Sequence, residues 1–301
     1  MAEVNPPDSV SAKMDSFFCD EVKRLSNGTV EIDLNTSAVL GDESEVLAEM
    51  ISSKKIDLAR ISLMELTKYG AKKSTILTLP YIFNDRKHFW KFAKSDLADE
   101  VLYEPSNTNG GVTGIFLAEE GFRHFFSTKE LKSIEDLDGQ RIRTSDDPVF
   151  QNVIKDLGAI PFTVQFSEII KEMILGNIDA ADQPIVNYQA NFFHTVAPNM
   201  ILDGHRIGAT EVIMTNSAWD SLTPELKKIF KKAGSNAADY CRSICEESER
   251  KAMEALEKEG VVFTEITDKS SWQEACKLTI KKQTSSNMDF YERIVEMGKS
   301  E

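Results

Sequence analysis

Two arginines in short polar motifs are the residues of this 301-residue chain that point most directly to chemistry. Arg123 ends the segment Gly121-Phe122-Arg123, and Arg143 lies in the segment Arg141-Ile142-Arg143-Thr144. A guanidinium carries five N–H donors in a fixed fork that matches a carboxylate bidentately. The two arginines therefore predict a clamp for a small organic acid. The alternative is that both are ordinary solvated or ion-paired side chains, as most isolated arginines are.

The overall charge of the chain limits the partners it can attract. The sequence holds 49 acidic and 35 basic residues, a formal net charge of -14. Such a surface repels nucleic acid and anionic membranes, so neither is expected as a partner. An anionic ligand must then be drawn in locally, and the two arginines would supply that positive spot.

Cysteine usage and hydropathy indicate neither a metal site nor a membrane segment. The four cysteines form no Cys-x-x-Cys pair and no histidine stands at metal spacing, so we expect no metal, no cofactor and four reduced packing residues. No apolar run reaches transmembrane length, and residues 1–5 lack the charged-then-apolar pattern of a leader. Residues 1–7 also leave no room for a full first strand, so we expect that the N-terminus of the chain has been trimmed or engineered.

The elements that must position the arginines alternate along the chain. Apolar spacing predicts a helix from Met14 to Leu25, a strand over 29–34, a helix from Leu40 and a strand over 56–62. Alternation of this kind predicts an α/β protein with a mostly parallel sheet and right-handed crossovers, whose ligands bind beyond the carboxyl ends of the strands. Ser62 and Glu65 fall at such an end.

The second half of the chain repeats the alternation. Strands are predicted over 112–118, 141–144, 160–163, 178–181, 210–214 and 261–263, and helices over 149–157 and 167–175. Thr223-Pro224-Glu225 is a strong helix start, and no proline follows before about Lys258. A helix of that length is long enough to span two lobes. Two further helices are expected at the C-terminal end.

The order of these motifs resembles the substrate-binding proteins of TRAP (tripartite ATP-independent periplasmic) transporters, the DctP-like family. Each motif alone is weak, and the ordered set carries the resemblance over most of the chain. The motifs are Glu3-Val4-Asn5-Pro6-Pro7-Asp8-Ser9, Asn27-Gly28, Leu40-Gly41-Asp42-Glu43, Leu79-Pro80-Tyr81-Ile82-Phe83, Gly121-Phe122-Arg123, Asp136-Leu137-Asp138-Gly139, Arg141-Ile142-Arg143 and Trp219-Asp220-Ser221-Leu222.

The resemblance implies a two-lobed, periplasmic-binding-protein-like fold of type II character, with hinge strands and a long interlobe helix. It places residues 1–120 and 209–250 in lobe I, and residues 121–208 and 251–301 in lobe II. The two lobes would close over one acidic ligand by a hinge motion. The resemblance implies that the chain binds its ligand without catalysing a reaction.

The resemblance also implies roles for single residues. The family's bidentate bond to the ligand carboxylate would fall to Arg143, with Arg123 supporting or joining it. Gln183 would take the place of a family asparagine, because this chain reads Asp179-Ala180-Ala181-Asp182-Gln183 where the family commonly has Asp-Gly-x-Glu-Asn. Phe166 would pack against the ligand, and Asp147 lies at the helix entry after Arg143.

A second set of positions is expected to recognise ligand hydroxyls. Glu3, Ser62 and Glu65 would come from the opposite lobe, although solvated loop ends are an equal alternative. Asn187 and His205 flank the second crossing between lobes. We interpret His205 as a hinge or surface histidine, because no partner acid or nucleophile for proton transfer is evident in the sequence.

The function expected from these residues is that of an extracytoplasmic solute receptor, which hands an organic acid to the permease subunits of a TRAP transporter. A hexuronate or related sugar acid is favoured, because a dicarboxylate calls for a second cation; Arg60 is the candidate that would reverse this choice. A C4-dicarboxylate or keto acid is the alternative ligand. A sensor module or an enzyme acting on a small carboxylate is the alternative class, although no nucleophile elbow, phosphate loop or metal motif supports an enzyme. We expect a periplasmic or otherwise extracytoplasmic monomer, either free or lipid-anchored.

Overall fold

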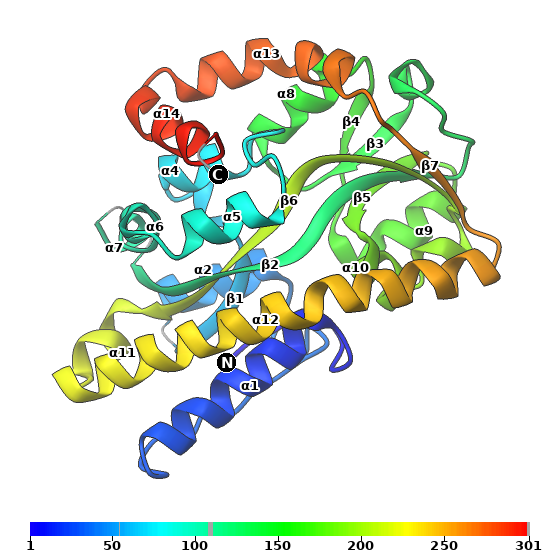
Figure 1. The fold of residues 1–301 in the computed structure, drawn as a ribbon. Coiled ribbons are helices and arrows are strands. Elements are labelled where there is room, and N and C mark those ends of the chain that lie inside the picture. Colours follow the sequence, from blue (N-terminus) through cyan, green and yellow to red (C-terminus); the bar gives the residue numbers. More distant parts are fainter. Residues whose placement is uncertain (54, 108–110, 300–301) are drawn as a thin grey trace. The chain divides into compact units, whose positions relative to one another are not determined.

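A computed structural model describes residues 1–53, 55–107 and 111–299, and the chain divides into two compact units (Figure 1). Unit 1 consists of Met1–Ser74, Trp90–Glu120 and Ala209–Ser248, and unit 2 consists of Thr75–Phe89, Gly121–Gly208 and Glu249–Glu301. Residues 75–89, expected in the first lobe, belong to unit 2. Among the described residues, no helix is long and apolar enough to cross a membrane.

Within the described part of the chain, seven strands pair in the order β1-β6-β2-β5-β3-β4, with β7 also on β6. They are β1 Leu58–Ser62, β2 Val112–Ser127, β3 Arg141–Thr144, β4 Ile160–Thr163, β5 Ala180–Pro184, β6 Asn199–Thr215 and β7 Val262–Glu265. The sheet is mixed: β3–β4, β3–β5 and β6–β7 are parallel, as predicted, whereas β1–β6 and β2–β5 are antiparallel. Helical crossovers join β3, β4 and β5 and make them parallel, whereas β2 and β6 carry the chain between the units and are free of that constraint.

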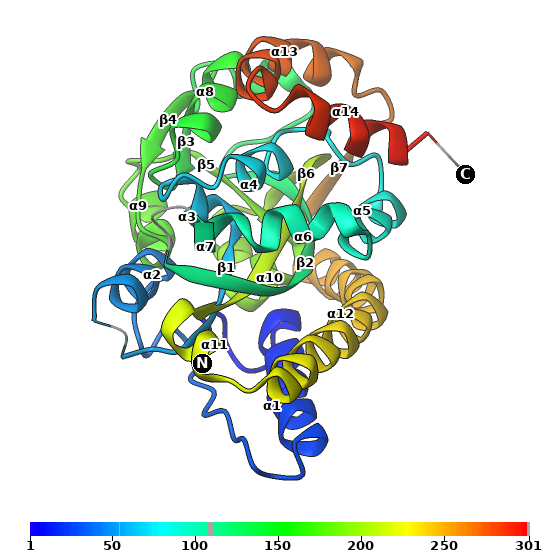
Figure 2. The ribbon, with the colours of Figure 1, turned by 90° about the vertical axis from the view of Figure 1, so that its left-hand side faces the viewer.

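The helices of unit 1 surround a core of aromatic and aliphatic side chains. They are α1 Val10–Leu25, α2 Glu43–Ser52, α3 Leu63–Thr67, α6 Asp96–Leu102, α7 Glu104–Asn107 and α11 Asn216–Ser221. Phe18 of α1 lies 5.2 Å from Phe116 and 6.0 Å from Phe230 between ring centroids. Phe17 stacks on Tyr240 of α12, in keeping with the two helices lying side by side in Figures 1 and 2.

The N-terminal part of unit 1 departs from the prediction at one strand. Helix α1 ends at Leu25, just before the predicted stop at Asn27 and Gly28, which both adopt positive φ angles; the Gly28 amide donates to the Lys23 carbonyl at 2.8 Å. Residues 29–34, however, form no strand. Ladder bonds need a partner, and among the described residues the bridge next to this segment is an isolated one between Ala2 and Asn35.

The helices of unit 2 are α8 Pro148–Asp156, α9 Ile169–Ile174, α10 Ile185–Ala190, α13 Ser270–Thr284 and α14 Met288–Met297, with short 3₁₀ turns at Ile134–Leu137, Phe166–Glu168 and Phe193–Thr195. Its core stacks Phe126 on Phe193 and Phe125 on Trp272. Three helices run from one unit into the other: α4 Lys72–Leu77, α5 Arg86–Ala93 and α12 Pro224–Lys258. The bounds of α12 confirm the predicted long helix.

Candidate functional site

Asp182 is the centre of a buried charge cluster in unit 2. Its carboxylate accepts from Arg123 Nε at 2.5 Å and from Arg206 Nη2 at 2.9 Å, and Arg123 Nη2 also donates to the Asp182 carbonyl at 2.6 Å. The strand pairing that sets Arg123 of β2 opposite Pro184 of β5 brings these groups together. Burial opposes ionisation of Asp182, but the charges of Arg123 and Arg206 outweigh it and hold the pKa of Asp182 well below its usual range.

His205 extends this cluster to a second carboxylate. Its Nε2 lies 3.3 Å from Asp182 Oδ2, and its Nδ1 lies 2.6 Å from Asp203 Oδ2. Burial works against the imidazolium, but Asp203 and Asp182 together raise the pKa of His205. The ring also stacks on Phe125 at 4.4 Å. The interpretation of His205 as a surface residue is wrong, because it is buried on β6, and its partner acids come from positions that the sequence does not place beside it.

Arg206 is a second buried cation that the sequence analysis did not single out. Its Cζ lies 3.8 Å from the centre of the Phe150 ring, a cation–π contact on α8. Two guanidinium groups thus share one carboxylate in a chain of net charge -14.

Arg143 is held on β3 by the neighbouring strand. Its Nε donates to the Val164 carbonyl at 2.9 Å, just beyond the parallel register of β3 and β4 that pairs Arg143 with Phe162. The side chain is half-buried. Fixing a guanidinium through its Nε reduces the side-chain entropy that anion binding would otherwise cost.

The remaining unit 2 candidates are held in different ways. Asp147 caps α8, where its Oδ1 accepts from the Val149 amide at 2.9 Å, so part of its role is structural. Gln183 is buried on β5 opposite His124, and Phe166 is half-buried with its ring edge-on to Phe193. Asn187 is 3% exposed, and its Oδ1 has no hydrogen-bond partner among the described residues. A buried acceptor in that state is suited to a ligand donor.

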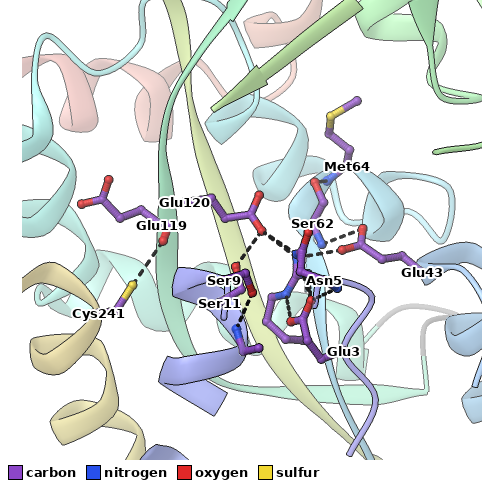
Figure 3. Close-up of polar contacts among 12 residues, drawn as sticks. Glu3, Asn5, Ser9, Ser11, Glu43, Ser62, Met64, Glu119, Glu120 and Cys241 are labelled. Carbon is purple, nitrogen blue, oxygen red and sulfur yellow. Dashed lines mark hydrogen bonds and ion pairs between the residues drawn. The ribbon is translucent and has the colours of Figure 1, made fainter. Parts of the chain in front are cut away.

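Glu3 in unit 1 belongs to a second charge cluster, centred on Arg60. Glu3 accepts two bonds from Arg60, from Nε and from Nη2, both at 2.6 Å. Arg60 Nη1 lies 2.8 Å from Glu43 and 3.2 Å from Glu120. We call Arg60, Glu3, Glu43, Glu120 and the adjoining Asp15 the Arg60 cluster. Figure 3 shows its three glutamates with Asn5, Ser11 and Ser62 beside them.

Neighbouring polar groups satisfy the carboxylates of the Arg60 cluster. Asn5 donates to Glu3 through its amide at 2.5 Å and its Nδ2 at 2.9 Å, and Ser11 Oγ donates to Glu120 at 2.9 Å (Figure 3). The Ser62 amide donates to Glu43 Oε2 at 3.1 Å. The sequence analysis predicts neither Glu43 nor Glu120 as a site residue. Glu43 stands in one of the quoted motifs, and its place at the start of a predicted helix is the sequence feature that could have pointed to it.

The other two unit 1 candidates stand where β1 ends. The Ser62 hydroxyl accepts from the Met64 amide at 3.4 Å and caps α3, and Glu65 pairs with Lys68 one turn later at 2.9 Å. The sequence placed both residues at a strand end, as found. Their part in ligand binding stays a prediction.

Comparison with known proteins finds a single protein family along nearly the whole chain. The family described as DctP, bacterial extracellular solute-binding protein family 7, matches residues 1–287. The C4-dicarboxylate-binding periplasmic protein DctP of Rhodobacter capsulatus is 24% identical over 91% of this chain and 82% of its own length. The sialic acid-binding periplasmic protein SiaP of Vibrio cholerae is 26% identical over 87% of this chain and 80% of its own.

Solved structures share the fold. A TRAP periplasmic solute-binding protein from Xanthobacter autotrophicus Py2 with bound β-D-galacturonate superposes with a TM-score of 0.93, at 26% identity and 98% coverage of both chains. A counterpart from Pseudomonas putida F1 with bound D-glucuronate has a TM-score of 0.93 at 24% identity, covering 97% of this chain and 95% of its own. Structures of this class are two-lobed, which confirms the predicted fold class.

Proposed function

Because this chain belongs to the bacterial extracellular solute-binding protein family 7, whose members are periplasmic, we propose that it is the solute receptor of a TRAP transporter and captures a hexuronate or a related sugar acid. It then delivers this acid to the membrane permease subunits. The observation that carries the proposal is the pair of clusters described above: a cation-rich one in unit 2 and an acid-rich one in unit 1.

Unit 2 has the chemistry of the carboxylate end. Arg143 binds the ligand carboxylate, and Arg123, locked to Asp182, supports it. A charge-assisted guanidinium–carboxylate bond is among the stronger hydrogen bonds in proteins, about 1.5 to 3 kcal/mol. Gln183, Phe166, Asp147, Asn187 and His205 are the further ligand contacts that we propose there.

Unit 1 has the chemistry of the hydroxylated end. Arg60 was the residue that would have favoured a dicarboxylate, but its guanidinium is bound by Glu3, Glu43 and Glu120. Glu3, Ser62 and Glu65 then act as acceptors for hydroxyls. The galacturonate in the 26%-identical receptor from Xanthobacter autotrophicus supports the same ligand class.

Isothermal titration calorimetry with D-galacturonate, D-glucuronate, sialic acid and succinate tests the ligand class, after a thermal-shift screen of the same acids. We expect one of the uronates to bind most tightly. Tighter binding of succinate or sialic acid would overturn the proposed class.

Arg143→Ala tests the clamp. We expect it to weaken binding of the preferred acid more than tenfold, in line with the loss of a charged hydrogen bond. Arg141→Ala is the matched control, because Arg141 lies on the same strand and pairs with Asp179, which Lys129 also contacts at 3.0 Å. Equal losses in the two variants would show that Arg143 acts only through net charge.

A further inference from the structure

The Arg60 cluster contains more carboxyl groups than its single cation can neutralise. Glu3, Glu43, Glu120 and Asp15 surround one guanidinium. Burial and the charge of Glu3 raise the pKa of Asp15 well above its usual range. The other three carboxyl groups, those of Glu3, Glu43 and Glu120, all contact the one guanidinium.

This arrangement removes Arg60 as an anion receptor. Its side chain is 2% exposed, and two of its nitrogens already form a bidentate pair with Glu3. A ligand carboxylate would have to displace a buried, charged partner and would add a fourth negative charge to the group. Like charges at close range repel strongly where water is excluded. A hydroxyl, in contrast, donates to a carboxylate at no such cost.

We propose that the Arg60 cluster is a specificity determinant, which admits the uncharged, hydroxylated end of a sugar acid and rejects a second carboxylate. The inference rests on the proposed sugar-acid function and narrows it to monocarboxylates. Aldaric diacids, which carry a carboxylate at both ends, are the excluded class.

Glu43 is the member of the cluster through which this selection can be tested. It is the first residue of α2, and its side chain is 19% exposed, more than that of Glu3, Glu120 or Arg60. The charged groups that face it are Arg60 from β1, Glu120 from β2 and Glu65 from α3. Burial and the two neighbouring carboxylates raise the pKa of Glu43 to about 7, against the effect of Arg60. The charge of the cluster therefore changes between pH 6 and pH 8.

The experiment compares the affinities for D-galacturonate and for galactarate, the diacid with the same carbon skeleton, by calorimetry at pH 8. We expect the wild type to prefer galacturonate by tenfold or more. Glu43→Gln removes one carboxylate charge with little change of shape, and we expect it to reduce this preference at least fivefold. The ring and open-chain shapes of the two ligands affect both proteins alike and cancel in the ratio.

Glu49→Gln is the matched control, because Glu49 lies on the same helix and contacts Ser53 and Lys55 instead of the cluster. We expect it to keep the wild-type preference. Lowering the pH from 8 to 6 should reduce the preference in the wild type and leave Glu43→Gln unchanged, since both ligand carboxylates stay ionised in this range. Glu120→Gln provides the same test if Glu43→Gln does not fold.

The outcomes separate the inference from the function on which it rests. A preference that is the same in the wild type and in Glu43→Gln, or that does not vary with pH, would overturn the inference while leaving the uronate receptor standing. Equal affinity of the wild type for both ligands would do the same. A wild type that binds neither acid would refute the proposed function, and the inference with it.

Discussion

Replacing Glu211 by glutamine is expected to stabilise the protein, and by an amount that grows with pH. Glu211 is fully buried on β6 in unit 1, and neither of its carboxyl oxygens has a hydrogen-bond partner among the described residues. Burial, with a smaller contribution from the charge of Glu104, raises the pKa of Glu211 well above its usual range. The folded protein therefore holds a proton that the unfolded chain releases above pH 4.5.

The sign follows from this difference in bound protons. Between pH 4.5 and the folded pKa, the free energy of unfolding of the wild type falls by about 1.4 kcal/mol for each pH unit because of this one group. Glutamine has nearly the same shape and does not titrate, so Glu211→Gln avoids the loss. The advantage of the variant should be near zero at pH 4.5 and should correspond to roughly 2 °C in melting temperature per pH unit above it for a chain of 301 residues.

The assay is a series of thermal and urea melts of the two proteins between pH 4.5 and pH 8. Glu104→Gln is the comparison variant, because Glu104 accepts a bond from the Lys73 amide at 2.7 Å and is not isolated as Glu211 is. A pH-independent difference between wild type and Glu211→Gln would refute the reasoning. So would a variant that is less stable at pH 7, because it would mean that the ionised carboxylate has a favourable partner.

Three further predictions concern other buried groups. Asp182→Asn should reduce the free energy of unfolding by about 3 to 5 kcal/mol at pH 7 in urea melts, because Arg123 and Arg206 lose their common counter-charge. The difference from wild type should shrink below pH 3.8, where acid protonates Asp182. In an NMR titration, His205 should become neutral only above pH 6.5, whereas burial lowers the pKa of His124 to about 4. A His205 side chain that titrates below pH 6.5 would contradict its placement between two carboxylates. Gly114→Ala should lower the melting temperature, because its Cβ would lie 2.0 Å from Glu211 Oε1 and 2.8 Å from the Leu102 backbone, and adding Glu211→Ala should recover part of the loss.

Local signals in the sequence were enough for the short elements and for the ends of helices. Strands β3 and β4 occupy the predicted residues, and α12 has the predicted start, where the Thr223 hydroxyl accepts from the Leu226 amide at 3.3 Å. These features depend on residues within one or two turns of each other, which is the range over which capping and periodicity act.

The lengths of β2 and β6 could not be predicted in the same way. The sequence pattern predicts that β2 ends near Ala118, but the strand continues through Glu119 and Glu120 to Ser127. These charged residues are tolerated in a buried strand because their partners come from elsewhere: Trp90 Nε1 donates to Glu119 at 2.5 Å, and Ser11 to Glu120. Strand β6 likewise continues through Asp203, His205 and Arg206. The sequence cannot show that such distant partners exist.

The same limit applies to the candidate site. Arg123 and Asp182 were both recognised from motifs, and the structure joins them directly. The sequence analysis misses Arg206 and Glu120, because the ion-pair partner of each lies far away in the chain. Arg206 pairs with Asp182, and Glu120 pairs with Arg60. Arg60 was recognised as a cation, but the sequence could not show that three carboxylates surround it. The role of Arg143 in ligand binding stays a prediction.

The two charge clusters have opposite compositions, and this contrast matters more for ligand choice than the net charge does. In unit 2, Arg123 and Arg206 converge on Asp182, and His205 lies between Asp182 and Asp203. In unit 1, the carboxyl groups of Glu3, Glu43 and Glu120 share Arg60, so acidic groups outnumber the cation. Guanidinium groups bind anions and carboxylates accept hydroxyl donors, so the proposed sugar monoacid suits the chemistry of each cluster, whereas a second carboxylate suits only that of unit 2. The charge asymmetry within the chain, rather than its total of -14, is therefore the physical basis for expecting a sugar monoacid.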